Sequence, residues 1–236
     1  MINKKNLSQQ IYEEIKNDIL HQRIAFGEKL TNRGLQEKYG VSSTPARDAI
    51  NRLHMDGLLD DISNVGARVI MFDDQMAFEV NEVMSILSCE AISMAAERGG
   101  RGEIVDLLEK NLQAQIENVG NENYYKYDKN FHNVFPDFCG NYKIRQIFEM
   151  NSALWELLVI SYPRDKDFSY EKPLSEHKRI LSAFKNGDIE AAKNWMKRHI
   201  DDGVPLLRYM KRDKINSGDG EINFPHPPSS THFFTD

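Results

Sequence analysis

The most restrictive feature of the chain is a pair of short helical patterns separated by a tight turn, within residues 27–57. Gly40 and Val41 make the turn, because glycine supplies a backbone freedom that other residues lack. Ser42 is a candidate N-cap for the second helix, and Pro45 falls in its first turn, where proline is tolerated. Apolar residues then recur at helical spacing and predict one buried side. They are Ala46, Ala49, Ile50 and Leu53.

The opposite side of this second helix is rich in hydroxyl groups and arginine. A helix start of this kind, directly after a tight turn, is what a helix-turn-helix uses to contact DNA. We expect Ser42, Ser43 and Thr44 to contact the DNA backbone and bases, since the helix dipole favours phosphate there. Arg47 and Arg33 are expected to contact phosphates or base edges.

The segments on either side complete a small domain. Residues 58–62 and 68–71 read as two strands joined by a turn at 63–67, which predicts a β-hairpin wing. Gly66 is expected to let the tip of this wing approach DNA. Before the pair of helices, a first helix is predicted over about residues 7–21, where apolar residues lie four apart. They are Leu7, Ile11, Ile15 and Ile19.

From residue 75 onward the chain shows helical patterns and no convincing strand. Six helices without intervening strands predict an antiparallel bundle. Their expected bounds are 78–98, 103–119, 123–139, 143–162, 173–185 and 188–210. The predicted fold is therefore mainly α, with a winged helix-turn-helix over 1–73 followed by an all-helical bundle over 75–211. The tail from 216 to 236 is rich in Pro, Gly and Ser, and we expect it to be disordered.

Composition favours a cytoplasmic protein. No apolar run approaches the roughly 18 residues of a membrane span, and the first ten residues lack the apolar segment of a secretory signal. Two cysteines far apart, Cys89 and Cys139, favour a reducing compartment without a disulfide framework.

The net charge of −6 is unevenly divided. Residues 1–72 carry 10 Lys and Arg against 9 Asp and Glu, so the acidic excess lies in the remainder of the chain. A nearly neutral first domain excludes a general polyanion binder. It favours a local basic face, dimeric binding to DNA or modest affinity for DNA.

The predicted bundle contains a pattern suited to a metal. Asp128 and His132 are four residues apart, so both face the same side of one helix. His177 and His199 each lie on another predicted helix, and antiparallel helices can bring all four side chains to one level. Three imidazoles and one carboxylate suit Zn²⁺, Ni²⁺ or another transition metal. Taken alone, the spacing is more typical of a surface ion pair or cap and of ordinary polar histidines than of a metal site.

The first of these two domains resembles the winged helix of the GntR family of bacterial transcription regulators. The resemblance is carried by residues 26–30, residues 40–50, Arg52, Leu53, residues 56–58 and Gly66.

The second domain resembles the all-helical FCD domain, which follows the winged helix in one large branch of that family. The matching positions, in order, are Asp128, Phe131, His132, Glu176, His177, Ile180, Leu181, Ala183, Phe184, Asn186, Gly187, Asp188, Ala192, Met196, His199 and Ile200. The resemblance covers roughly residues 7–211.

This resemblance implies a homodimeric regulator that binds an inverted-repeat operator in double-stranded DNA. It implies a divalent metal, first of all zinc, held by Asp128, His132, His177 and His199. A small effector, such as an organic acid, would bind beside that metal and control DNA affinity. Two alternatives remain at this point: a metal-dependent, hydrolase-like enzyme, and a DNA-binding dimer with a purely structural metal.

The chain departs from the family pattern at three positions. Many relatives have an arginine where Met84 stands, and that arginine often pairs with an effector carboxylate, which methionine cannot do. Relatives commonly have arginine where Ser43 stands, so a bidentate guanine contact is lost here. They often have glycine where Gln22 stands, at the end of the first helix.

Overall fold

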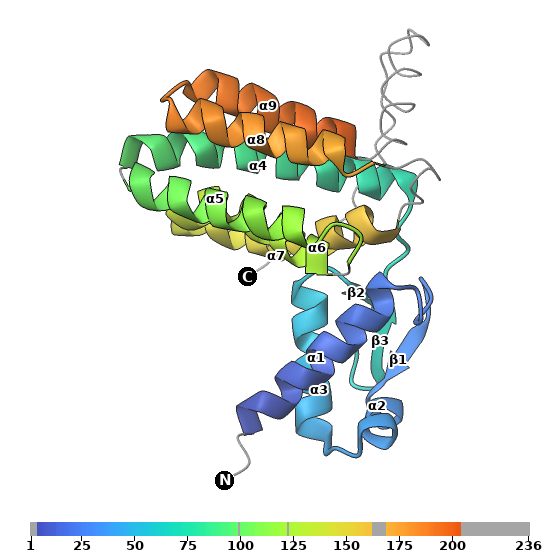
Figure 1. The fold of residues 1–236 in the computed structure, drawn as a ribbon. Coiled ribbons are helices and arrows are strands. Elements are labelled where there is room, and N and C mark those ends of the chain that lie inside the picture. Colours follow the sequence, from blue (N-terminus) through green and yellow to red (C-terminus); the bar gives the residue numbers. More distant parts are fainter. Residues whose placement is uncertain (1–3, 99, 122, 162–168, 204–236) are drawn as a thin grey trace, which may run out of the picture.

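A computed structural model describes residues 4–98, 100–121, 123–161 and 169–203 of the chain, and the predicted tail lies outside these residues. The described part is mainly α, with a small three-stranded sheet near its start, so the predicted fold class is confirmed (Figure 1). The N-terminal elements are α1 (Lys4–Leu20), β1 (Lys29–Thr31), α2 (Asn32–Tyr39), α3 (Ser43–Met55), β2 (Leu59–Asp60) and β3 (Gly66–Val69). The remaining helices are α4 (Asp74–Arg98), α5 (Arg101–Glu117), α6 (Asn123–Phe138), α7 (Tyr142–Ser161), α8 (Glu171–Lys185) and α9 (Ile189–Gly203).

The helix-turn-helix consists of α2, the turn at Gly40 and α3. Gly40 has φ 62°, in the left-handed region, and its N–H donates to the Gln36 carbonyl, which ends α2. Thr31 caps the start of α2 by accepting a hydrogen bond from the Gly34 N–H. Ser42 occupies the N-cap position of α3 as predicted, but its hydroxyl makes no capping hydrogen bond with that helix and is exposed.

The sheet contains a strand that the periodicity of the sequence does not reveal. Besides the two strands of the wing, β1 pairs antiparallel with β3, so the strand order is β1-β3-β2. A strand of three residues is too short to show a period of two. Gly66 lies opposite Thr31 in this ladder, where a β-carbon would overlap the Leu30 carbonyl oxygen. Close packing of β1 on β3 therefore explains this glycine.

The helical domain begins directly after the wing. α4 starts at Asp74, four residues before the predicted start, and the Asp73 carboxylate accepts a hydrogen bond from the Met76 N–H at 2.9 Å. In Figure 1, α4 runs between the α8–α9 pair on one side and the helices α5, α6 and α7 on the other. No helix of the described part is both long and apolar enough to cross a bilayer.

One apolar core joins the two domains. Buried residues of the N-terminal part, among them Ile15, Leu53 and Leu58, belong to the same cluster as Met84, Leu157 and other buried residues of the helical part. Met84 has no exposed surface. The position where many relatives have arginine is therefore a packed core position in this chain.

Candidate metal centre and nucleic-acid interface

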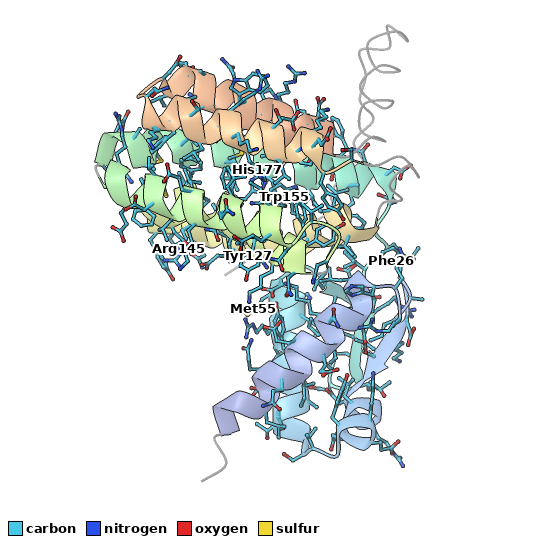
Figure 2. The ribbon with its side chains drawn as sticks, viewed as in Figure 1. Phe26, Met55, Tyr127, Arg145, Trp155 and His177 are labelled. Carbon is cyan, nitrogen blue, oxygen red and sulfur yellow. The ribbon has the colours of Figure 1, made fainter. Side chains whose placement is uncertain are left out.

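Three histidines from three helices meet inside the helical domain. His132 comes from α6, His177 from α8 and His199 from α9, and all three are buried. Their Nε2 atoms lie 3.0 Å (177 to 199), 3.2 Å (132 to 199) and 3.3 Å (132 to 177) apart. Figure 2 shows His177 within the domain, between the helices.

Asp128 completes the group, one turn before His132 on α6. Its Oδ1 lies 3.9 Å from Nε2 of His177, and one donor atom from each of the four residues falls within 4.8 Å of the others. The structure therefore brings together all four residues that the sequence singles out as metal ligands. Their role as ligands remains a prediction.

Partners on the outer side fix the orientation of two of the rings. Nδ1 of His199 lies 3.0 Å from the buried Glu176 carboxylate, and Nδ1 of His177 lies 2.8 Å from Oε1 of Gln115. The Gln115 amide donates to the Tyr127 carbonyl at 3.2 Å, which keeps its oxygen turned toward His177. Amide and carboxylate oxygens accept hydrogen bonds here, so both Nδ1 atoms carry the proton.

The inward nitrogens therefore face one another with lone pairs. A neutral imidazole has one N–H, and in His177 and His199 that hydrogen lies on the outer nitrogen. Two lone pairs 3.0 Å apart repel unless a positive charge lies between them. Metal-bound histidines have this arrangement, with the outer N–H held by a carboxylate or carbonyl.

The separations also fit a single ion. Nitrogens bound to one ion at about 2.0–2.1 Å lie roughly 2.8–3.0 Å apart at the right angles of an octahedral site and roughly 3.3–3.4 Å apart at the tetrahedral angle of zinc, so adjacent ligands span roughly 2.8–3.4 Å. The observed separations of 3.0–3.3 Å fall in that range before any ion is added.

Burial keeps His132 and His177 neutral. It lowers the pKa of His132 well below 6.5, and the nearby His199 lowers it further. Burial likewise lowers the pKa of His177, assisted by His199 and His132. Among the described residues, Nδ1 of His132 has no hydrogen-bond partner, and its ring meets Trp155 edge to face at 4.9 Å between centroids. Neutral imidazoles are the form that binds metals.

A small pocket opens beside this cluster, between α6 and α7. Asp128, Asn133 and Lys129 line it from α6, and Ser152 and Trp155 line it from α7. It places polar groups and an aromatic ring next to the predicted metal ligand Asp128, as a ligand site requires.

The predicted DNA-contacting face is exposed at the start of α3. Ser42, Ser43, Thr44 and Arg47 all lie on the surface, and Arg33 is exposed on α2 in an ion pair with Glu37. Such an exposed pair contributes little to stability, so Arg33 can exchange Glu37 for a phosphate. Gly66, by contrast, is buried against β1. Its predicted contact with DNA remains untested, and its packing alone accounts for the glycine.

Further residues, not singled out as site residues from the sequence, support both sites. Asn64 in the wing accepts a hydrogen bond from the Arg47 guanidinium at 2.9 Å, and its carbonyl accepts one from Asn32. Asn51, on the exposed side of α3 that the helical spacing already predicts, lines the same groove between α3 and the wing. Glu176 was visible as the neighbour of His177, but nothing in its spacing showed that it orients His199.

Comparison with known families identifies both parts of the chain. The pattern of the family described as "Bacterial regulatory proteins, gntR family" matches residues 7–69, and that of the FCD domain matches residues 79–202. The second match covers more than half of the chain.

Individual relatives agree with these matches. An HTH-type transcriptional regulator of Bacillus subtilis, YdhC, is 24% identical over 206 residues, covering 85% of this chain and 91% of the relative. The HTH-type transcriptional repressor RspR of Escherichia coli is 24% identical over 219 residues, covering 88% and 91%. Among solved structures, E. coli McbR/YncC has a TM-score of 0.66 at 20% identity, covering 89% of this chain and all of that one. This structure supports the fold.

Proposed function

Because the chain belongs to the GntR family and carries an FCD domain, it is a DNA-binding transcriptional regulator, and we propose that a small metabolite controls its DNA affinity from a divalent metal site. Asp128, His132, His177 and His199 would hold the metal, with zinc as the first candidate and nickel or another transition metal as alternatives. The observation that carries the proposal is the convergence of three Nε2 atoms within 3.3 Å, two of them with their lone pairs directed inward.

The metal would supply a localised positive charge to which a carboxylate ligand can bind. The pocket between α6 and α7 lies next to Asp128, so a small organic acid there would reach the metal and the Lys129 ammonium together. Lys129 offers a cation near the site. Met84 carries no charge and is buried in the core, so it cannot pair with a carboxylate.

On the DNA side, α3 is the proposed recognition helix. Ser42, Ser43 and Thr44 would contact the backbone and bases at its start, and Arg47 and Arg33 would contact phosphates or base edges. Two copies paired through their helical domains would read an inverted repeat. Such a regulator would act in the cytoplasm.

Of the two alternatives raised by the sequence, only the structural metal is retained. A metal-dependent hydrolase is not supported, because the family and the names of the relatives indicate a transcriptional regulator. A purely structural metal in a DNA-binding dimer is the second candidate. It is favoured by the burial of all three histidines, and it predicts metal binding without any effect of small acids on DNA affinity.

The test begins with protein prepared without a polyhistidine tag, with metal content measured by elemental mass spectrometry. We expect about one divalent ion per chain, lost in the His132→Ala/His199→Ala variant. His21→Ala/His54→Ala is the matched control, because these two histidines lie outside the cluster. Absence of metal from the wild type, even after resupply of zinc, nickel and manganese, would contradict the metal site. The positive charge between the facing nitrogens would then be a proton.

The second step addresses control of DNA binding. An operator is selected from a random-sequence duplex library, and its affinity for the metal-loaded protein is measured with a panel of metal-chelating organic acids. A change in affinity with at least one acid in the wild type, absent in the double histidine variant, supports an effector site. Metal binding with no change for any acid supports the structural metal.

A further inference from the structure

Three consecutive residues of α7 connect the histidine cluster to the DNA-binding domain. Leu154 lies against Gly57, and Glu156 forms an ion pair with Lys16 of α1 at 2.7 Å. Between them, Trp155 meets the His132 ring at 4.9 Å between centroids. One turn of helix therefore touches both functional regions, and Figure 2 shows Trp155 near His177 in the domain interior.

The contact at Gly57 reaches the end of the recognition helix. Gly57 follows α3 by two residues and has φ 71°, in the left-handed region that favours glycine. A β-carbon there would lie 3.1 Å from Cδ1 of Leu154, so the leucine packs closely on the turn. A shift of α7 would therefore move the turn that ends the recognition helix.

Glu156 also forms a second ion pair, with a lysine that lines the pocket beside the cluster. The carboxylate also pairs with Lys129 at 2.9 Å, and Lys129 follows the predicted metal ligand Asp128 on α6. The Lys16 side chain is 10% exposed and that of Glu156 is 25% exposed, so water and salt screen this pair less than a surface pair. Glu156 thus joins α1, α6 and α7 at one point.

The pocket beside the cluster is too small for an organic ligand as it stands. Its volume is about 30 Å³, which is room for roughly two water molecules. Trp155, Glu156 and Lys129 form part of its wall. A carboxylic acid of even a few carbon atoms can enter only if these side chains, or the helices that carry them, move apart.

From these contacts we infer that residues 154–156 of α7 couple occupancy of the histidine cluster and its pocket to the position of the recognition helix. This inference rests on the proposed function, because it concerns regulation of the same site. In the described arrangement, the histidines converge and the Lys16–Glu156 ion pair is formed at the same time. A metal favours this arrangement, and a ligand that opens the pocket loosens the contacts at Glu156 and Leu154 and releases the DNA-binding domain.

The coupling can be tested with Zn²⁺ alone, because coupling between two sites is reciprocal. Lys16→Met breaks the domain contact from the DNA-binding side without touching a predicted ligand. Zn²⁺ affinity of the full chain is measured by competition with a chromophoric chelator. Lys38→Met is the matched control, because Lys38 pairs with Asp18 inside the DNA-binding domain. We expect Lys16→Met to weaken Zn²⁺ binding by at least about fivefold, and Lys38→Met to leave it unchanged.

Hydrogen exchange measured by mass spectrometry supplies the second readout. In the wild type, Zn²⁺ should slow exchange in α6 and α7 and also in residues 50–60, which include Gly57. In Lys16→Met the effect on α6 and α7 should persist, while the effect on residues 50–60 is lost.

The outcomes separate the two proposals. If the wild type binds Zn²⁺, but Lys16→Met has wild-type affinity and residues 50–60 do not respond, the coupling is overturned and the metal site stands. If the wild type binds no Zn²⁺, the metal site is overturned, and the coupling with it.

Discussion

Nε2 of His177 lies 3.0 Å from Nε2 of His199, although the partners on the outer side of both rings direct a lone pair inward from each. Glu176 and Gln115 create this situation by holding the outer N–H groups. Glu176 and Gln115 thus destabilise the empty cluster and favour a bound cation. Their substitution should therefore lower metal affinity.

Glu176→Gln should weaken zinc binding about 10- to 100-fold, because the carboxylate that orients and polarises His199 is replaced by a neutral amide. The measurement is a chelator competition at neutral pH. Glu171→Gln is the control, since Glu171 is exposed in the first turn of the same helix. Equal zinc affinities for the two variants would show that Glu176 does not support metal binding.

His199→Ala should lose bound metal and lower the melting temperature of the metal-loaded protein. A ligand that binds only the folded state stabilises it, so that contribution disappears with the site. Elemental analysis and calorimetry test this together. A variant with full metal and unchanged melting would exclude His199 as a ligand.

Arg47→Ala should weaken binding to the selected operator by about 1–3 kcal/mol, roughly 5- to 150-fold, without changing the melting temperature. Arg47 is exposed beside the groove between α3 and the wing, where its guanidinium donates a hydrogen bond to Asn64. Fluorescence anisotropy across several salt concentrations measures the effect. Arg145→Ala on α7 is the control, and an Arg47 variant that binds as well as that control would contradict the assignment.

Gln22→Gly should stabilise the protein by about 0.5–1 kcal/mol, because Gln22 has φ 54°, where a residue with a β-carbon is strained. The midpoint of urea unfolding measures the gain. Gln22→Ala keeps the β-carbon and should show no such gain. Equal stability of the two variants would mean that the turn relaxes when the side chain is changed.

Acid should weaken the contact between the domains through Glu156. Burial tends to raise the pKa of this carboxyl, but Lys16 and Lys129 outweigh burial and hold the pKa below its usual 4.5. A lowered pKa in the folded state means that the pair stabilises the protein fully above 4.5 and loses this contribution as pH falls through the folded-state value.

Stability measured by urea unfolding from about pH 6 to about pH 3.5 should therefore fall more steeply in the wild type than in Glu156→Gln. Glu109→Gln, which removes an exposed pair with Lys185, provides the comparison. Parallel curves for the wild type and Glu156→Gln would show that the pair does not contribute in this range.

Local sequence rules were sufficient where one helix or one turn carries the information. The turn at Gly40, the buried side of α3 and the shared face of Asp128 and His132 all follow from short-range spacing. No local pattern joins His177 and His199 to α6. They were grouped with Asp128 and His132 because each lies on its own predicted helix of the bundle, and the resemblance to the FCD domain strengthened that grouping.

Other features depend on contacts between distant segments and were not predictable in this way. β1 is too short to show a period, and Gln115 meets His177 only because α5 and α8 pack together. The contact between Leu154 and Gly57 depends on how the two domains are placed, which no spacing within either domain encodes.

The apolar core that runs through both domains has a consequence for folding and for protein engineering. Because Leu53 and Leu58 bury against the same cluster as Met84 and Leu157, the two domains should unfold in a single cooperative transition. A DNA-binding domain expressed alone would expose part of this core and would be prone to aggregate. A chimaera that grafts these DNA-reading helices onto another sensor domain should therefore also carry the α7 residues on which they rest.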